Sequence, residues 1–560
     1  PQTPSPFGGT RAFFFGAPPN MASFLDLSHT ALEAKGSHMN MRRMLQLAVL
    51  ALAAGLGGCG GGGGGGGSAG TTATFSGVVS YDYVPNASGA LSYNATVSKP
   101  VRGAGVDIVD ARTGAVLAST ATDDNGQYQA TAMPQGAVVV RVRAQLARRA
   151  PGASWDVTVR DNTNSDALYA IESPSFAVAG TSASRDLHAS SGWGGSGYSG
   201  DRTAAPFAIL DTVYTAMGKV ASVAPDAVFP SLRLFWSPQN APAEGAISAG
   251  QIGTTSFVAA NSGSAIYVLG KENVDTDEYD ESVIAHEWGH YYQHAFSRDD
   301  SPGGAHDISE LVDQRLAFSE GWGNAWSGIA LNRRNYTDSL DAGQRAGMNM
   351  DLIANPGGSL GWYREASIQA VVWQLNSRWG FAGIHQAMSG GLRNTRTVTT
   401  IHAFAAAYAA TVPAASSDLS ALLVAQSISG NTNDPWATTE SNRAGLPSSV
   451  ALPLYVPLTA GSGGTATACV TNQYGDGNKL GDFAYVRVTV PTARAYQITV
   501  SGPGGSDPDF DVFAGGRLAS SLGLGTSETA TVGLPAGDVV LAVNDANHSA
   551  SNTCFNIRVQ

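Results

Sequence analysis

The sequence predicts a multidomain fold in which an N-terminal β-sandwich and a C-terminal β-sandwich flank a central α+β domain. Three observations predict this fold. First, a chain of 560 residues suggests about three or four domains. Second, short alternating apolar runs between turn residues, typical of half-buried strands, dominate residues 73–188 and the chain from residue 451 onward. Third, apolar residues at helical spacing dominate residues 277–427.

The composition changes divide the chain further. Residues 36–39, Gly-Ser-His-Met, are typical of a cloning remnant, so we exclude the stretch before the first signal from fold reasoning. The expected division is 1–40 upstream or cloning-derived and disordered, 41–58 an export signal, 59–72 a glycine-rich tether, 73–188 a β-sandwich, 189–203 a Gly/Ser linker, 204–447 the α+β domain, and 448–560 the second β-sandwich.

The composition also excludes one class of partner. Hydrophobic residues make up 43% of the chain, which is enough to form packed cores. The formal net charge is −12, and the sequence contains no basic stripe. Nucleic-acid binding depends on clustered Lys and Arg, so we expect no nucleic-acid partner.

An export signal precedes the first β-rich segment. A basic start at residues 41–44 is followed by an apolar run at 45–56, which is shorter than the roughly 20 residues that span a bilayer. Leu56-Gly57-Gly58-Cys59 then resembles the lipobox of a bacterial lipoprotein signal. The resemblance implies that Cys59 is acylated and anchors the protein to a membrane. Because Gly60 rather than Asp follows it, the resemblance favours the outer membrane or cell surface. The alternative is an ordinary cleaved signal and a secreted protein.

The cysteine count fits export. The chain has three cysteines, Cys59, Cys469 and Cys554. If Cys59 carries lipid, the other two form an even pair in an oxidising compartment, and we expect a disulfide that closes the C-terminal domain. Two free buried thiols are the alternative.

The N-terminal segment has strand patterns at 74–79, 105–109 and 137–142. Residues 110–144, with the Asp-Asp-Asn-Gly turn at 123–126, resemble the carboxypeptidase regulatory-like, transthyretin-like β-sandwich. Members of that family are usually spacers or binding modules.

The C-terminal segment has strand patterns at 483–490, 495–502, 509–516 and 537–545. It resembles the bacterial pre-peptidase C-terminal domain, a small β-sandwich appended to secreted peptidases. Its acidic strand is matched by Asp507, Asp509 and Asp511. Alternate residues share one face of a strand, so these carboxylates either converge on Ca²⁺ or form a solvated face.

The central segment begins with a helical pattern at 204–220 and strand patterns at 232–236 and 265–269. His286-Glu287-Trp288-Gly289-His290 follows, and it is an HExxH motif. Residues four apart lie on one helical face, so His286 and His290 can reach one Zn²⁺. Glu287 is placed to act as the general base that takes a proton from the attacking water.

The third ligand has several candidates. His294 lies about 12 Å along the helix from His286, too far to share its metal. Glu320, in a helical stretch that reads SEGWGNAW, resembles the third ligand of thermolysin-like (gluzincin) zinc metallopeptidases. That family has an Asp four residues later, which supports one of the zinc-binding histidines. This chain has Asn324 at that position, so we expect its amide oxygen to accept from the imidazole N–H instead. The alternative ligands are His306, Glu310 and Asp313.

The resemblance implies a zincin-like fold for the central domain and a zinc-dependent endopeptidase outside the cytoplasm, with a protein or peptide as substrate. Such enzymes stabilise the oxyanion with a downstream side chain, and Tyr363, His385 and His402 are candidates. Residues 265–269 are expected to be the edge strand for an extended substrate. A non-catalytic surface lipoprotein with a degenerate peptidase domain is the main alternative, and hydrolysis of a non-peptide bond is another.

Overall fold

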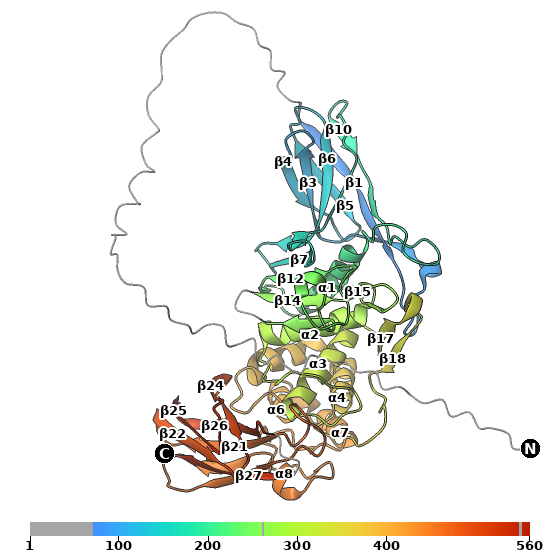
Figure 1. Cartoon of the computed structure of the whole chain (residues 1–560). Helices are drawn as coiled ribbons and strands as arrows, with labels where there is room; N and C mark the ends of the chain where they lie inside the picture. Colours follow the sequence, from blue (N-terminus) through green and yellow to red (C-terminus); the bar gives the residue numbers. More distant parts are fainter. Residues whose placement is uncertain (1–70, 260–262, 548–551) are drawn as a thin grey trace, which may run out of the picture.

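The computed structural model describes residues 71–259, 263–547 and 552–560. It confirms the multidomain α+β fold, with β-sheets at the N-terminal end, helices in the middle and a β-sandwich at the C-terminal end (Figure 1). The expected signal at 41–58 and the expected lipid site at Cys59 lie outside the described residues.

The first sheet has five strands gathered around β1 (Ala73–Tyr83). Inward-facing residues such as Phe75, Val79 and Tyr81 alternate with more exposed ones along β1, as the sequence pattern predicts. Its partners are β2 (Val97–Pro100), β5 (Gln127–Ala132), β10 (Ser182–Ser184) and β11 (Leu187–Ala189).

The second sheet has nine strands and continues into the central region. β7 (Trp155–Asp161) pairs in parallel with β12 (Leu232–Trp236), so residues 189–203, the expected linker, connect two segments that share this sheet. The other strands are β3 (Ala104–Asp110), β4 (Val116–Ala121), β6 (Val138–Arg148), β8 (Ala167–Leu168), β9 (Ala170–Glu172), β13 (Ser256–Val258) and β14 (Ser264–Val268).

The expectation that residues 265–269 form the edge strand of this sheet is wrong. The strand expected at 265–269 is β14, but β14 is paired on both sides, in parallel with β12 and antiparallel with β13. The edge strand is therefore β13. Its three residues were too few to give a periodic signal in the sequence.

The described residues form seven α-helices in the central region, and an eighth, α8 (Ser448–Ala451), lies against the C-terminal sandwich (Figure 1). The seven are α1 (Ala205–Ala221), which corresponds to the helix expected at 204–220, α2 (Glu281–Phe296), α3 (Gln314–Leu331), α4 (Glu365–Trp379), α5 (Phe381–Ala387), α6 (Ile401–Thr411) and α7 (Ser416–Ala425). A small antiparallel sheet beside them contains β15 (Gly270–Lys271), β16 (Asp275–Thr276), β17 (Asn335–Leu340) and β18 (Ala346–Asp351).

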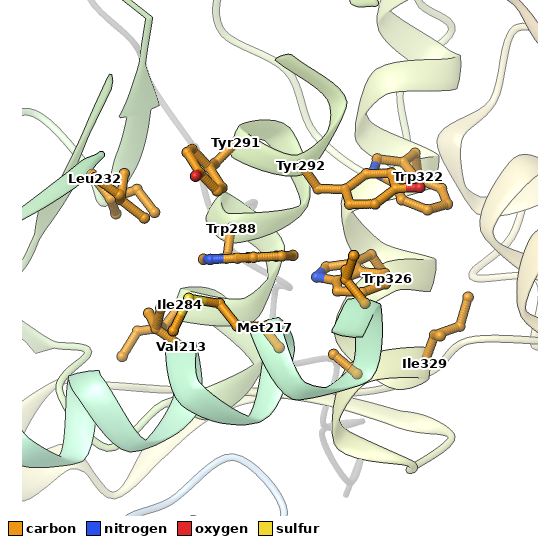
Figure 2. Close-up of a cluster of buried hydrophobic side chains, with 14 of the residues drawn as sticks. Val213, Met217, Leu232, Ile284, Trp288, Tyr291, Tyr292, Trp322, Trp326 and Ile329 are labelled. Carbon is orange, nitrogen blue, oxygen red and sulfur yellow. The ribbon is translucent and has the colours of Figure 1, made fainter. Parts of the chain in front are cut away.

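Buried aromatic side chains hold α2 against α3 (Figure 2). The rings of Trp288 and Trp326 stack with centroids 5.3 Å apart, and Tyr292 stacks on Trp326 at 5.3 Å. Trp322 donates a hydrogen bond to the carbonyl of Gly289 at 2.9 Å. These tryptophans are fully buried, which confirms that they belong to the core. This packing fixes the distance between the two helices that carry the candidate site.

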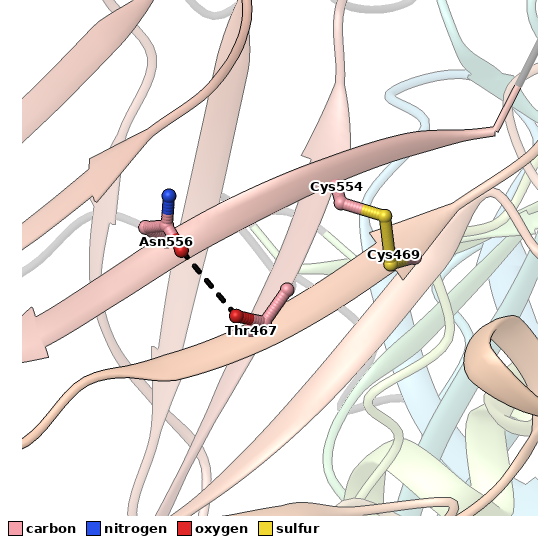
Figure 3. Close-up of a disulfide and its surroundings, with 4 residues drawn as sticks. All are labelled: Thr467, Cys469, Cys554 and Asn556. Carbon is pink, nitrogen blue, oxygen red and sulfur yellow. Dashed lines mark hydrogen bonds between the residues drawn. A yellow bond between two sulfur atoms is a disulfide. The ribbon is translucent and has the colours of Figure 1, made fainter.

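The C-terminal domain is a sandwich of two sheets (Figure 1). One sheet contains β19 (Val456–Thr459), β21 (Phe483–Val490), β26 (Gly537–Asp545), β23 (Pro508–Phe513) and β24 (Arg517–Ser521). The other contains β20 (Ala466–Val470), β27 (Thr553–Val559), β22 (Arg494–Ser501) and β25 (Ser527–Leu534). Cys469 and Cys554 stand opposite each other on β20 and β27 and form the expected disulfide (Figure 3).

Within the part of the chain that the structure describes, no helix combines the length and the apolar character that crossing a bilayer requires.

Candidate metal centre

Helices α2 and α3 bring together three of the predicted site residues. His286 and His290 lie one turn apart on α2, and Glu320 faces them from α3. α3 begins at Asp313, whose side chain accepts a hydrogen bond from the backbone N–H of Arg315, a typical helix N-cap. The helix and its cap therefore aim Glu320 at the histidine pair.

The distances among the three side chains fit a single metal ion. The Nε2 atoms of His286 and His290 are 3.0 Å apart. The Oε2 atom of Glu320 is 3.1 Å from Nε2 of His286 and 3.5 Å from Nε2 of His290. Ligand atoms about 2.1 Å from a tetrahedral Zn²⁺ are about 3.4 Å apart. The three residues can therefore hold a metal ion without rearrangement.

Neighbouring side chains orient the first histidine. Nδ1 of His286 is 2.9 Å from the side-chain oxygen of Asn324, and the amide nitrogen of Asn324 donates to Glu365 at 3.4 Å. The amide oxygen must then accept, so His286 carries its proton on Nδ1 and presents the lone pair of Nε2 to a metal. The amide at Asn324 thus makes the contact that was expected of it.

The second histidine is oriented in the same way. The hydroxyl of Ser319 donates to Asp299 at 2.8 Å, so its oxygen accepts from Nδ1 of His290 at 3.3 Å. Nε2 of His290 faces Glu320, whose carboxylate favours a proton on this ring in the metal-free chain, and a bound metal would replace that proton. Nothing in the sequence pattern indicated that Ser319 and Asp299 would have this role.

The charge state of Glu320 suits metal binding. Burial alone would raise the pKa of this carboxyl group, but His306 and His290 beside it hold the pKa well below its usual value. The carboxylate is therefore ionised at neutral pH, as a zinc ligand must be.

Glu287 is held by the edge strand of the large sheet. Its Oε2 atom accepts a hydrogen bond from the backbone N–H of Phe257, on β13, at 2.8 Å. Burial raises the pKa of Glu287, and the adjacent His286 and His290 oppose that shift. The second carboxylate oxygen, Oε1, is left for other partners. A raised pKa makes the group a better proton acceptor than an exposed glutamate.

His306 enters the site although its surroundings read as a loop. Its Nε2 atom is 3.2 Å from Oε2 of Glu320 and 4.0 Å from Oε2 of Glu365. Together with these carboxylates it forms a second group that could hold a metal, and this group shares Glu320 with the first. The sequence signal for His306 was weak because nothing local shows how the loop is held.

The other two alternative ligands are engaged elsewhere. Asp313 caps α3 and pairs with Arg315, while Glu310 pairs with Lys479 at 2.8 Å. His294 packs its ring against Phe257 at 5.9 Å.

The three oxyanion candidates also have partners of their own. Tyr363 donates to the carbonyl of Leu360, Tyr292 contacts Nδ1 of His385 at 2.8 Å, and His402 pairs with Glu440 at 3.0 Å. Each of them is therefore used in packing the helical region.

Carboxylates gather at two further places. Asp275, Asp277 and Asp338 lie close enough to hold a metal beside the start of α2. In the C-terminal domain, Asp507 accepts from the N–H of Gly525 at 2.7 Å and Asp511 accepts from Ser520. Among the residues that the structure describes, Asp507, Asp509 and Asp511 do not form a group of that kind.

Comparison with known proteins assigns no family to this chain. No protein-family model and no curated protein matches it. Among solved structures, the pre-peptidase C-terminal domain of a Bacillus anthracis collagenase is 13% identical over 19% of this chain and 96% of that one, with a TM-score of 0.16. A periplasmic g-type lysozyme inhibitor from Aeromonas hydrophila is 18% identical over 19% of this chain and 96% of that one, with a TM-score of 0.13.

The fold and the site together define a multidomain α+β protein with a buried His-His-Glu group that could hold a metal ion.

Proposed function

We propose that this chain is an exported, zinc-dependent peptidase that uses Glu287 as its general base. One observation carries the proposal: His286, His290 and Glu320 present three ligand atoms at zinc-like separations, and Glu287 stands beside them on the same helix. A degenerate, non-catalytic relative would have no reason to keep both histidines oriented through Nδ1 and a base held by β13.

The bound metal and Glu287 would have different roles in the proposed reaction. A bound Zn²⁺ would polarise the scissile carbonyl and lower the pKa of a water molecule towards about 7. The N–H of Phe257 holds one oxygen of Glu287, so the other oxygen can take a proton from the attacking water and deliver it to the leaving amine.

The substrate is proposed to be an extended peptide. β13 is the end strand of the nine-stranded sheet, and it contacts Glu287 directly. An extended segment that adds to such an edge would run past the candidate metal centre, with its backbone aligned by main-chain hydrogen bonds. This assignment replaces residues 265–269 with β13 as the substrate strand.

The proposed location is outside the cytoplasm, with a lipid anchor at Cys59. The Cys469–Cys554 disulfide is consistent with an oxidising compartment, and the lipobox-like sequence at 56–59 supplies the anchor. The net charge of −12 supports a protein or peptide partner rather than a nucleic acid.

Metal analysis combined with a peptide-library digest tests the proposal. The purified chain is expected to contain one zinc at the histidine pair, to cleave peptides, and to lose cleavage when a chelator removes the metal and regain it when zinc is restored. A chain that binds zinc without cleaving any peptide would favour the non-catalytic surface lipoprotein. A chain that binds no zinc would end the proposal.

A further inference from the structure

We propose that the C-terminal β-sandwich is part of the metal centre, because its residues 478–480 position His306 against Glu320. This inference rests on the proposed function. The sandwich lies directly against the helical region (Figure 1).

His306 needs support from outside its own segment. It lies in the stretch 301–310, which forms no helix and no extended strand, and Gly303 and Gly304 adopt positive φ angles of 65° and 94°. The ring nevertheless has a defined place: Nδ1 is 3.1 Å from the carbonyl of Gly304 and Nε2 is 3.2 Å from Glu320. An isolated loop of this kind would lose conformational entropy on fixing such a ring.

Asn478 supplies the first part of the support. This buried side chain lies inside the bend of the loop and donates to the carbonyls of Gly303 at 2.8 Å and Ala305 at 3.1 Å. The loop backbone approaches so closely that a Cβ on Gly304 would lie 2.9 Å from the amide nitrogen of Asn478. The hydrogen bonds from Asn478 therefore fix the backbone conformation of the residues just before His306.

Lys479 supplies the second part. Its ammonium group donates to the carbonyl of Ala305 at 2.7 Å and pairs with Glu310 at 2.8 Å. Only 8% of Lys479 is exposed, so these contacts compensate for burying its charge. The ammonium group thus ties both sides of the His306 loop to one point.

The backbone of the same segment fixes the start of α3. The N–H of Asp313 donates to the carbonyl of Asn478 at 2.8 Å, and the N–H of Leu480 donates to the carbonyl of Leu311 at 2.9 Å. Asp313 caps the helix that carries Glu320. Residues 478–480 therefore hold both members of the His306–Glu320 pair at once.

A second contact strengthens the joint. The guanidinium group of Arg315, in the first turn of α3, lies over the rings of Phe483 and Tyr485, 4.4 Å and 5.3 Å from their centroids. Tyr485 also donates to Asp313. Both aromatic residues belong to β21 of the sandwich. The first turn of α3 and the C-terminal sheet thus share one buried interface.

His306 acts in this proposal as a positioning residue. Its ring nitrogen holds the carboxylate oxygen of Glu320 that faces His286 and His290. Removing partners that orient a zinc ligand typically lowers metal affinity about 10–100-fold. Asn478→Ala and Lys479→Met should therefore weaken zinc binding although neither residue lies at the metal.

The test measures the zinc dissociation constant of the full chain by competition with a chromophoric chelator. His306→Ala is expected to raise the constant about 10–100-fold, and Asn478→Ala and Lys479→Met are expected to raise it by up to the same factor. His306→Gln keeps a donor near the Nε2 position and should restore most of the affinity. Asn556→Ala removes the same amide, and Arg517→Met removes a cationic side chain, from exposed positions of the same sandwich, so both should leave the constant unchanged.

The double variant His306→Ala/Asn478→Ala separates positioning from general destabilisation. If Asn478 acts through His306, the two effects will not add, and the double variant will match His306→Ala. In the metal-free chain, the hydrogen-exchange rate of residues 301–313 should rise in Asn478→Ala and Lys479→Met. It should not rise in the control variants Asn556→Ala and Arg517→Met. Additive effects, or wild-type zinc affinity in both variants, would overturn the positioning role while leaving the zinc site intact. A wild-type chain without zinc would instead overturn the proposed function.

Discussion

At the scale of single residues, Glu287 offers the sharpest test of mechanism. Glu287→Gln should retain both the bound zinc and the native fold. The amide oxygen can still accept the hydrogen bond from the N–H of Phe257, and the metal ligands are unchanged. Hydrolysis should fall by about 10²–10⁴-fold, since an amide cannot accept the proton. Peptide turnover at matched zinc content measures this, with the exposed Glu244→Gln as control. Equal turnover in the variant and the wild type would remove Glu287 from the mechanism.

Substitutions of Glu320 and His294 distinguish a metal ligand from a nearby residue that does not bind the metal. Glu320→Gln should lower zinc retention, because it removes the ionised oxygen that faces both histidines. His294→Ala should keep a stoichiometry near one, since its ring packs against Phe257 instead. Zinc content after dialysis against a weak chelator decides between them. Loss of zinc from the His294 variant alone would make the ligand assignment wrong.

At the scale of elements, the contact between α2 and α3 depends on Gly323. A Cβ at this position would lie 2.8 Å from Cε1 of His286, so Gly323→Ala should displace the ring and weaken zinc binding. Gly218→Ala is the matched control in α1, because its Cβ would meet no atom within 4 Å. That change should be neutral or stabilise by up to about 1 kcal/mol. Zinc affinity and thermal unfolding of both variants provide the comparison, and unchanged affinity in Gly323→Ala would contradict this account.

The turn before α2 should make stability depend on pH. Burial, with Asp277 and Asp338 beside it, raises the pKa of Asp275 to about 11. The folded chain therefore keeps a proton on Asp275 that the unfolded chain loses above about pH 4. The contribution of this group to stability is largest below that pH and falls as the pH rises towards about 11. Asp338→Asn removes a neighbouring buried carboxyl group whose own pKa is also raised, so this variant should lose less stability between pH 5 and pH 8. Denaturant unfolding in the presence of chelator measures how the free energy of unfolding depends on pH in the wild type and in the variant. Equal dependence in both would contradict the proposed effect of Asp338 on Asp275.

At the scale of the whole molecule, the proposed lipid anchor at Cys59 predicts where the protein is found in the cell. A membrane fraction from the native host should contain the chain with diacylglycerol on Cys59, because the residues before it match a lipobox-like signal. Intact-mass analysis of that fraction measures the modification, and Cys59→Ser should release the protein from the membrane. An unmodified N-terminus beginning elsewhere would show an ordinary cleaved signal instead.

Much of the molecule could be predicted from local patterns. A four-residue spacing puts His286 and His290 on one helical face whatever surrounds them, because the period of the helix is fixed. Alternating apolar residues predict the strands of both β-rich ends. These features depend on neighbours in the sequence, so the sequence by itself determined them. The Cys469–Cys554 pair was predicted differently, from a count of three cysteines with Cys59 assigned to lipid.

The tertiary structure alone decided which distant residues meet. β13 was too short to give a periodic signal, yet it is the sheet edge that holds Glu287. The sequence offered His306 only as one of three alternative ligands, because the side chains that hold its loop, Asn478 and Lys479, lie more than 170 residues away in the sequence. Local periodicity reports how a segment folds on itself, whereas a loop side chain takes its place from long-range contacts that leave no periodic trace.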